Sequence, residues 1–306
     1  MIWALPPIFR KLSGPHIRMN EVFLNGRFVE ASQARISPMD RGFLFADGIY
    51  EVIPVFNGVL FRAEQHLRRL ERSLDGLQIP SPHSVPEWVE LCRELVRRNG
   101  GGDLSLYMQV TRGAPDKRDH PFPYPVVPPT VFMSATSVTR SPTHDADAAL
   151  GFAAITLDDI RWGRCDIKSV SLLPNVLAKQ QAYAMGAAEA ILIRDGLVTE
   201  GASTNVFLIE SGRISTPPRS TRILNGITRE LIIELCARHR IPLVEREIPK
   251  AELYDADEIW ISSSTKDITP IVSVDTRRIG HGIPGERWKS FARLFVDYKL
   301  SVCSPG

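Results

Sequence analysis

Two Asn-Gly pairs, each lying between short apolar runs, restrict the fold of this chain more than any other feature. They are Asn25-Gly26 and Asn57-Gly58. Asparagine and glycine readily adopt the positive φ angles of a two-residue hairpin turn, so each pair predicts two antiparallel strands. The predicted strands are 22–24 with 27–29, and 49–55 with 58–61.

Helical periodicity follows the hairpins and recurs later in the chain. Leu67, Leu70, Leu74 and Leu77 recur at spacings of three and four, which predicts an amphipathic helix over 63–77. Strand pairs mixed with helices, without a regular βαβ alternation, indicate an α+β fold built as two α/β domains. The other predicted elements are helices over 86–98 and 174–186 and from 226, and strands over 104–110, 153–157, 190–193, 205–209 and 258–262.

The polar segment SVTRSPTHDADAA (137–149) predicts a boundary between the two domains. We expect a small N-terminal domain over 19–137, a linker over 138–147 and a larger C-terminal domain over 148–306. Residues 1–18 precede Met19 and are expected to be an extension outside the fold. Their apolar part is broken by two prolines and followed by positive charge, which is the wrong order for a signal peptide.

Composition and charge exclude several classes of protein. The chain has 306 residues, of which 43% are hydrophobic, enough for a sizeable core. The net charge of +2, with both signs mixed, gives no nucleic-acid surface, and no apolar run approaches the ~20 residues that span a bilayer. The four cysteines are far apart and form no CxxC, which argues against a metal site and favours the cytoplasm.

Two lysines lie in the stretch DIRWGRCDIKSVSLLPNVLAKQQA (159–182). Lys179 follows Leu177 by two residues on the predicted helix, about 200° around the axis at ~100° per residue. With Leu173, Leu177 and Ala184 assigned to the buried side, Lys179 is predicted to point to solvent.

Lys168 lies in an extended stretch with apolar neighbours. Spacing alone favours a surface ion pair with Asp166. In a partly apolar pocket, however, a lysine has a lowered pKa and can form a Schiff base. Glu200 presents a similar choice, because it is either a turn acid or the partner of a buried cationic ring nitrogen.

Several other groups are suited to an anion. Ile227 and Thr228 begin a predicted helix, whose N-terminal N–H groups attract anions, and SSST (262–265) follows a predicted strand. Arg69 flanks the apolar stripe of the first helix. Each of these is more often an ordinary cap, turn or solvated side chain. Together with Lys168 and Glu200 they supply what a pyridoxal phosphate site needs.

Five sequence blocks resemble one family. The chain from about Met19 onward is similar to the class IV (fold-type IV) pyridoxal-phosphate aminotransferases, most closely the D-amino-acid aminotransferases. The blocks are DRGFLFADGIYEV (40–52), RWGRCDIKSVSLLPNVLAKQQA (161–182), EAILIRDGLVTEGASTNVF (189–207), ILNGITRE (223–230) and SSSTKDITP (262–270).

The resemblance implies a role for each candidate residue. Lys168 matches the catalytic Schiff-base lysine and Glu200 the acid bonded to the pyridine nitrogen. Leu224 matches the residue packed against the ring, and Tyr50 a tyrosine near the substrate. The implied fold places pyridoxal 5′-phosphate between two domains of a homodimer. The implied phosphate contacts are Arg69, Ile227, Thr228, Ser264 and Thr265.

The loop VTRGAPDKRDHPFP (110–123) bears on substrate handedness. Arg118 and His120 stand two apart, so both side chains lie on one side of an extended loop. A solvated loop is the commoner reading of that spacing. By resemblance, however, the pair joins Tyr50 in binding the substrate α-carboxylate, with the loop coming from the partner subunit. This implies amino transfer from a D-amino acid, such as D-alanine or D-glutamate, to a 2-oxo acid by a ping-pong mechanism.

Three alternatives remain open. A branched-chain L-amino-acid aminotransferase shares the fold, but its glycine-asparagine-tyrosine run is absent from KSVSLLPN. Aminodeoxychorismate lyase also shares the fold, and the TRG…RDH loop fits it poorly. A cofactor carrier without turnover would not need Lys168, Glu200 and Tyr50 together. The chain departs from the family pattern at Ala46, usually glycine, at Asn225, often proline, and in a longer loop before Arg118.

Overall fold

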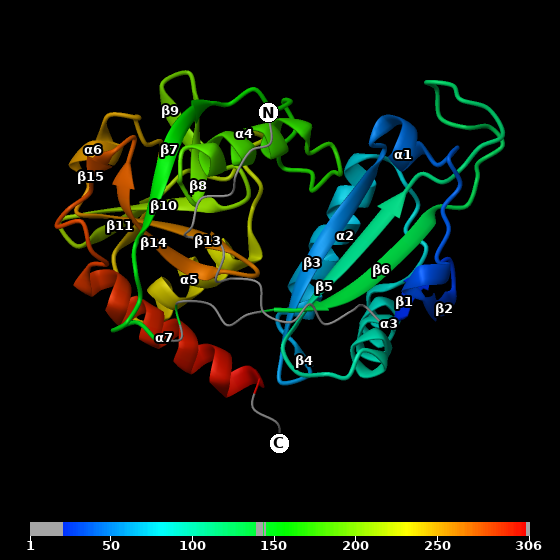
Figure 1. Ribbon diagram of the computed structural model, residues 1–306, viewed down its shortest axis with the longest axis horizontal. Coiled ribbons are helices and arrows are strands. Elements are labelled where there is room, and N and C mark those ends of the chain that lie inside the picture. Colours follow the sequence, from blue (N-terminus) through cyan, green and yellow to red (C-terminus); the bar gives the residue numbers. More distant parts are fainter. Residues whose placement is uncertain (1–20, 139–142, 144, 304–306) are drawn as a thin grey trace.

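Two β-sheets with flanking helices lie side by side in the computed structural model, which describes residues 21–138, 143 and 145–303 (Figure 1). One sheet is formed before residue 138 and the other after residue 151. The predicted α+β class is therefore confirmed. The predicted extension 1–18 lies outside the described residues, as does part of the predicted linker 138–147, so those boundaries stay predictions.

The first sheet is antiparallel and contains both predicted hairpins. Asn25 and Gly26 have φ angles of 48° and 87°, and Asn57 and Gly58 of 51° and 80°, as this type of turn requires. Both hairpin predictions are confirmed. The strand order is β2 (Arg27–Glu30), β1 (Glu21–Leu24), β6 (Thr130–Ser137), β5 (Leu104–Thr111), β3 (Gly48–Phe56), β4 (Val59–Leu60).

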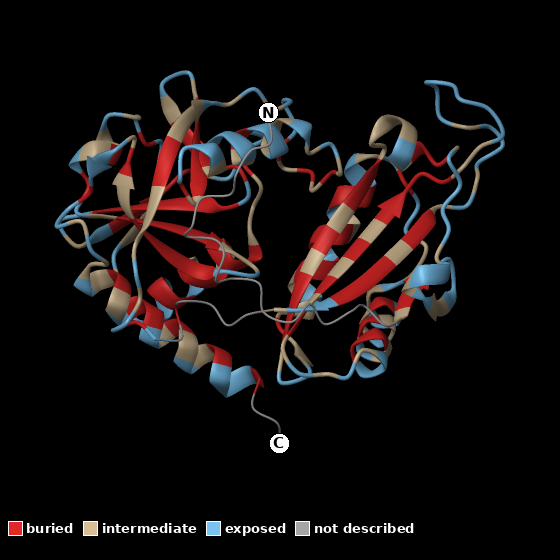
Figure 2. Ribbon diagram, viewed as in Figure 1, coloured by how far each residue is buried: buried red, intermediate tan, exposed pale blue. Residues whose placement is uncertain are grey.

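Helices α2 (Ala63–Gly76) and α3 (Val85–Arg98) cover one face of this sheet with the predicted apolar stripes. Leu67 and Leu74 of α2 and Trp88 of α3 are fully buried against it. The strands of the sheet alternate buried and half-buried residues, because the opposite face is only partly covered (Figure 2). That opposite face includes Tyr50. A short 3-10 helix (Ala31–Gln33) and α1 (Arg41–Phe45) connect β2 to β3.

The second sheet is mixed and has nine strands. Helices α5 (Ile227–Arg238) and α7 (Glu286–Cys303) pack on it around the buried Trp260 and Trp288. Helix α6 is short (Glu252–Asp255). The strand order is β12 (Leu243–Glu245), β11 (Arg213–Thr216), β10 (Asn205–Glu210), β13 (Glu258–Ser263), β14 (Asp267–Val274), β7 (Phe152–Asp158), β8 (Glu189–Arg194), β9 (Leu197–Gly201), with β15 (Arg277–Arg278) paired to β14.

Helix α4 (Leu173–Ala184) packs on β7 and β8 in an orientation that corrects the prediction. Its buried residues are Ala178 and Ala182. The three residues assigned to its buried side, Leu173, Leu177 and Ala184, are all exposed. The small alanine side chains let the helix lie close to the sheet, which leaves the leucines on the outer face.

The prediction that Lys179 points to solvent was therefore wrong. Its neighbour Ala178 is buried, and its own side chain is only 38% exposed. The Lys179 ammonium donates to the Ala188 carbonyl at 2.6 Å and lies 3.1 Å from the buried carboxylate of Glu189. Lys179 is thus a paired structural lysine rather than a solvated one.

Two further findings concern the rest of the described chain. None of its helices is both long and apolar enough to cross a bilayer. The four cysteines are buried free thiols.

Candidate active site

A cavity of about 410 Å³ is lined by residues of both halves of the chain. The first half contributes Tyr50 and Val52 of β3, Arg69 of α2 and Ser105 of β5. The second half contributes the segment before α4, the end of β9, the start of α5 and the turn after β13. Nine of the eleven predicted site residues line this cavity: Tyr50, Arg69, Lys168, Glu200, Leu224, Ile227, Thr228, Ser264 and Thr265.

Lys168 is fixed by hydrogen bonds to the first sheet. The Tyr50 N–H donates to the Lys168 carbonyl at 2.9 Å, and the Val170 N–H donates to the Gly48 carbonyl at 3.0 Å. The Lys168 N–H donates to Ser73 Oγ at 3.2 Å. The first two bonds place the segment alongside β3, with an isolated bridge between Ile49 and Ser169.

The side chain of Lys168 lies beside Tyr50 within the cavity. Its Nζ is 4.1 Å from the centroid of the Tyr50 ring. The alternative ion pair with Asp166 does not form, because Asp166 accepts two hydrogen bonds from Arg164 at 2.9 and 3.0 Å. Lys168 therefore presents its amine to the cavity.

Glu200 is the next-to-last residue of strand β9, and its carboxylate is almost completely buried. The carboxylate accepts hydrogen bonds from the Asn205 amide at 3.0 Å, from the Leu224 N–H at 3.0 Å and from Arg161. Burial raises the pKa of Glu200 to about 7, although Arg161 and the Leu224 N–H act against that rise. Glu200 is a buried strand residue, not a turn acid, and a cation beside it would favour its charged form.

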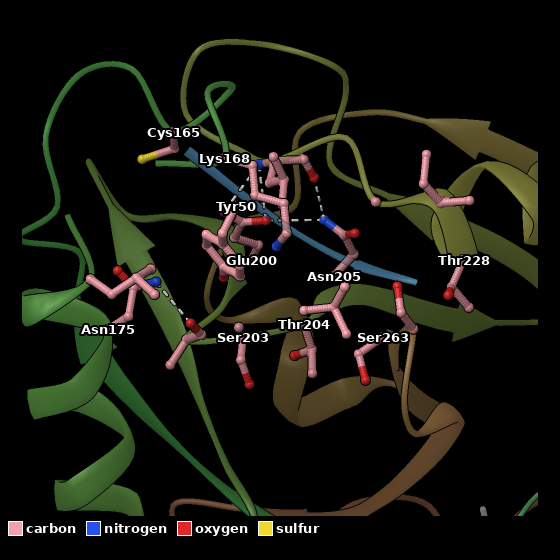
Figure 3. A pocket seen from close by; sticks show the side chains of 18 of the residues that line it. Tyr50, Cys165, Lys168, Asn175, Glu200, Ser203, Thr204, Asn205, Thr228 and Ser263 are labelled. Carbon is pink, nitrogen blue, oxygen red and sulfur yellow. Dashed lines mark hydrogen bonds between the residues drawn. The ribbon is translucent and has the colours of Figure 1, made fainter. Parts of the chain in front are cut away.

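Hydroxyl and N–H groups gather at a different part of the cavity from Lys168, Tyr50 and Glu200 (Figure 3). Ile227 and Thr228 form the first turn of α5, whose N-cap is Gly226. The hydroxyls of Thr204 and Ser262 are buried and have no hydrogen-bond partner within the described chain. Unpaired hydroxyls beside a helix N-terminus fit a phosphate, which accepts several hydrogen bonds.

Arg69 is buried at the edge of this region. Its guanidinium donates to both oxygens of Glu51 at 2.6 and 2.9 Å and to the Asn225 carbonyl at 3.0 Å. His66 Nδ1 also lies 2.9 Å from Glu51. Glu51 and His66 thus fix the guanidinium in place while it lines the cavity. The residues present fit the cofactor that the sequence resemblance implies.

Several lining or supporting residues were not predicted. Arg161 binds Glu200 and is itself held by Asp159 at 2.9 Å. The sequence marks these residues only as polar side chains within segments that otherwise form buried strands and turns. The residues missed are Glu51, Arg161, Ser203, Thr204, Asn205 and Lys266.

Arg118 and His120 do not line the cavity of their own chain. Both are exposed, and both lie against Phe45, with the Arg118 guanidinium 4.6 Å from the ring centroid and the His120 ring 5.3 Å away. Arg41 donates to the carbonyls of Asp119 and His120 at 2.6 and 3.1 Å, which fixes this loop. The pair is ordered but presented outward.

Comparisons with known proteins agree with this geometry. The family described as Amino-transferase class IV matches residues 48–274. The chain belongs to the class IV aminotransferases. It is 43% identical over 282 residues to a D-alanine aminotransferase of Bacillus licheniformis, covering 92% of this chain and 98% of that protein. It is 42% identical to a D-alanine aminotransferase of Staphylococcus haemolyticus, with the same coverage.

Solved structures show the same fold for this aminotransferase. The branched-chain amino acid aminotransferase of Escherichia coli has a TM-score of 0.83 at 25% identity, and the match covers 92% of this chain and 94% of that one. That of Thermoproteus uzoniensis, solved with norvaline, has a TM-score of 0.82 at 26% identity, and the match covers 94% of this chain and 97% of that one. The predicted fold-type IV architecture is therefore confirmed.

Proposed function

We propose that this aminotransferase moves an amino group from a D-amino acid to a 2-oxo acid, with pyridoxal 5′-phosphate as its cofactor. One observation carries the proposal: Lys168, Glu200 and a set of phosphate-suited donors line a single cavity. The two D-alanine aminotransferases at 42–43% identity over nearly all of their length support the D-amino-acid class. The buried free thiols suit a reducing cytoplasm.

Bound pyridoxal phosphate supplies a ring that withdraws electrons from the reacting carbon. The chain supplies the proton transfers and the orientation. The Lys168 amine, beside Tyr50, would remove the Cα proton of the substrate as a general base and then, as a general acid, deliver it to the cofactor carbon that is bonded to the amino group. Burial raises the pKa of Glu200 to about 7, and a protonated ring nitrogen beside the carboxylate would lower that pKa and keep Glu200 deprotonated.

The cofactor assignment is tested on the purified protein. Reduction with borohydride followed by peptide mapping should place the pyridoxyl group on Lys168. Lys179, which is paired with Glu189, is the internal control. A pyridoxyl group on Lys179, or a protein that binds no pyridoxal phosphate, would refute the assignment.

The working unit is proposed to be a homodimer in which the partner's loop completes the carboxylate site. Arg118 and His120 are ordered by Arg41 yet exposed on the outside of their own chain. The tip of the same loop exposes three large apolar side chains, as a surface that packs on a partner would. These are Phe122, Tyr124 and Val126.

Complementation between two inactive variants tests this arrangement. Lys168→Ala and Arg118→Ala chains, unfolded together and refolded, should form mixed dimers with one complete site each. Activity at low substrate concentration should return to about a quarter of the wild-type value, since half of the dimers are mixed and each has one working site. If Arg118 acts in its own chain, mixing restores nothing.

A branched-chain L-amino-acid aminotransferase is the alternative that the solved structures favour, since they share the fold at 25–26% identity. A panel of D- and L-amino acids with pyruvate and 2-oxoglutarate as acceptors decides between the two. We expect activity with D-alanine and D-glutamate and little with their L forms. Activity confined to L-leucine and L-valine would favour the branched-chain function, and release of pyruvate from aminodeoxychorismate, with no activity in the amino-acid panel, would favour the lyase.

A further inference from the structure

The turn between β13 and β14 forms part of the cavity wall and carries a cation, Lys266. The Lys266 N–H donates to Ser263 Oγ at 3.2 Å, and its carbonyl accepts from Thr269 Oγ1 at 3.4 Å. The next residue, Asp267, forms a buried ion pair with Lys299 at 2.7 Å. The backbone of Lys266 is thus fixed at the cavity wall.

Lys266 belongs to a charged cluster with Lys179 and Glu189. Glu189 is buried, lies 3.1 Å from Lys179, and accepts a hydrogen bond at 3.0 Å from the hydroxyl of Ser203, which also lines the cavity. Burial lowers the pKa of Lys266, Lys179 lowers it further, and Glu189 acts in the opposite direction. An anion bound beside Lys266 would stabilise the charged form of its ammonium group.

The position of Lys266 indicates which of two anions it would bind, the phosphate of the cofactor or a carboxylate of the substrate. Three of the groups suited to the cofactor, Arg69, Glu200 and Thr228, are buried. Lys266 is covered enough for its pKa to fall, but part of its side chain stays exposed, which places it at the mouth of the cavity. Substrates enter and leave there in every catalytic cycle, whereas the cofactor stays bound.

We propose that Lys266 binds the side-chain carboxylate of dicarboxylic substrates. The enzyme then selects acidic D-amino acids, such as D-glutamate, as donors and 2-oxo dicarboxylic acids as acceptors. The inference rests on the proposed function, because it assigns the second carboxylate of the substrates that the cavity is proposed to accept. An ammonium–carboxylate contact at a partly desolvated wall gives about 10- to 100-fold selectivity.

Steady-state kinetics with one fixed monocarboxylic acceptor, 2-oxobutyrate, test the proposal. In Lys266→Gln, kcat/KM for D-glutamate should fall about 10-fold or more through a higher KM, while kcat/KM for D-alanine stays within about twofold. Lys266→Glu should lower kcat/KM for D-glutamate relative to kcat/KM for D-alanine still further. The control is Lys289→Gln on α7, which removes one positive charge at a residue that does not line the cavity and should leave the ratio unchanged.

Binding to the holoenzyme gives a second readout that needs no turnover. Titration calorimetry should show that the wild type binds glutarate more tightly than butyrate and that Lys266→Gln loses this difference. If the ratio of the glutarate and butyrate dissociation constants is the same in the variant as in the wild type, the proposal is overturned. Weaker pyridoxal phosphate binding, with equal losses for D-glutamate and D-alanine, also overturns it and makes Lys266 a phosphate contact.

These outcomes separate the two proposals. If the wild type lacks activity with any D-amino acid, the proposed function fails. The glutarate and butyrate titrations still decide whether Lys266 binds a second carboxylate. If D-alanine is a substrate but Lys266→Gln leaves both ratios unchanged, only the Lys266 assignment fails.

Discussion

Glu51 and Glu200 are both buried carboxylates bound by an arginine at the cavity, yet their pKa values shift in opposite directions. Burial alone would raise the pKa of Glu51, but Arg69 and His66 hold it well below its usual range. Burial raises the pKa of Glu200 to about 7 in spite of Arg161. Burial is therefore not what separates the two acids.

The two pKa values shift in opposite directions because the arginines bind different numbers of carboxylates. Arg69 gives two hydrogen bonds to Glu51 alone. Arg161 gives two to Asp159 and is shared with Glu200, so its charge is divided between two acids. Glu51 thus neutralises Arg69 within the protein, whereas the proposed function pairs Glu200 with a cation from outside, the protonated pyridine nitrogen of the cofactor.

The largest expected effect is on turnover in Glu200→Gln. The neutral amide cannot hold the ring nitrogen protonated, so kcat should fall about 1000-fold, equivalent to ~4 kcal/mol of barrier. Pyridoxal phosphate should still bind, since the phosphate donors are unchanged. Glu210→Gln, the same chemical change at an exposed residue, is the control. A kcat equal to that of the wild type would show that Glu200 has no role in the reaction.

A smaller but still large effect is expected on stability in Glu51→Gln. The substitution leaves Arg69 and His66 buried without their anion, and breaking a buried pair in this way costs about 3 kcal/mol. Urea unfolding of the cofactor-free protein measures it. Glu64→Gln, which breaks an exposed ion pair with Arg68, should change little. Equal unfolding midpoints for the two variants would refute this account.

Stability should also depend on pH through both acids, with opposite signs. The folded pKa of Glu200 lies above its ordinary value of 4.5, so the folded state binds the proton more tightly. Its contribution is fully present below about pH 4.5 and is lost as pH rises toward 7, by up to about 3 kcal/mol. Glu51 has a lowered folded pKa, so its contribution is present above pH 4.5 and is lost as pH falls.

Urea unfolding of the cofactor-free wild type and Glu200→Gln, at intervals from pH 5 to 7.5, measures the Glu200 contribution as a difference. The difference should change steadily across this range. A constant difference would mean that Glu200 does not titrate there.

The smallest effect is expected in Arg161→Met. Glu200 loses its guanidinium but can take up a proton, and Asp159 keeps Arg194 at 3.1 Å. The loss of unfolding free energy should be about 1–2 kcal/mol, below that of Glu51→Gln. The pH range over which Glu200 titrates should move upward. A loss as large as in Glu51→Gln would show that Glu200 cannot be neutralised in the folded state.

The parts of the fold that follow from local pattern were predictable. The Asn-Gly hairpins and the stripe of Leu67, Leu70 and Leu74 depend on neighbours a few residues apart. Helix α4 was placed correctly but its buried side was not, because close packing favoured Ala178 and Ala182 over larger leucines. Strand β6 and helix α7 were not predicted, since their burial is decided by distant elements.

The same limit applies to the candidate site. Lys168 and Glu200 were found through family blocks, not through spacing, which favoured an ion pair and a turn acid. Arg161 lies 39 residues from Glu200 along the chain, and no local pattern links them. The outward position of Arg118 and His120 likewise depends on Arg41, about 80 residues earlier, which binds the carbonyls of that loop.

The hydrogen bonds between strand β3 and the segment around Lys168 have a mechanical consequence. The segment around Lys168 follows the first sheet in space, through Tyr50, Gly48 and the Ile49–Ser169 bridge, although it belongs to the second half of the chain. Glu200 is built into the second sheet. The distance between the Lys168 amine and the Glu200 carboxylate therefore depends on how the two halves of the chain are aligned. We expect substitutions between the two halves, such as one that breaks the Arg62–Glu234 ion pair, to lower activity by misaligning the halves without changing a cavity residue.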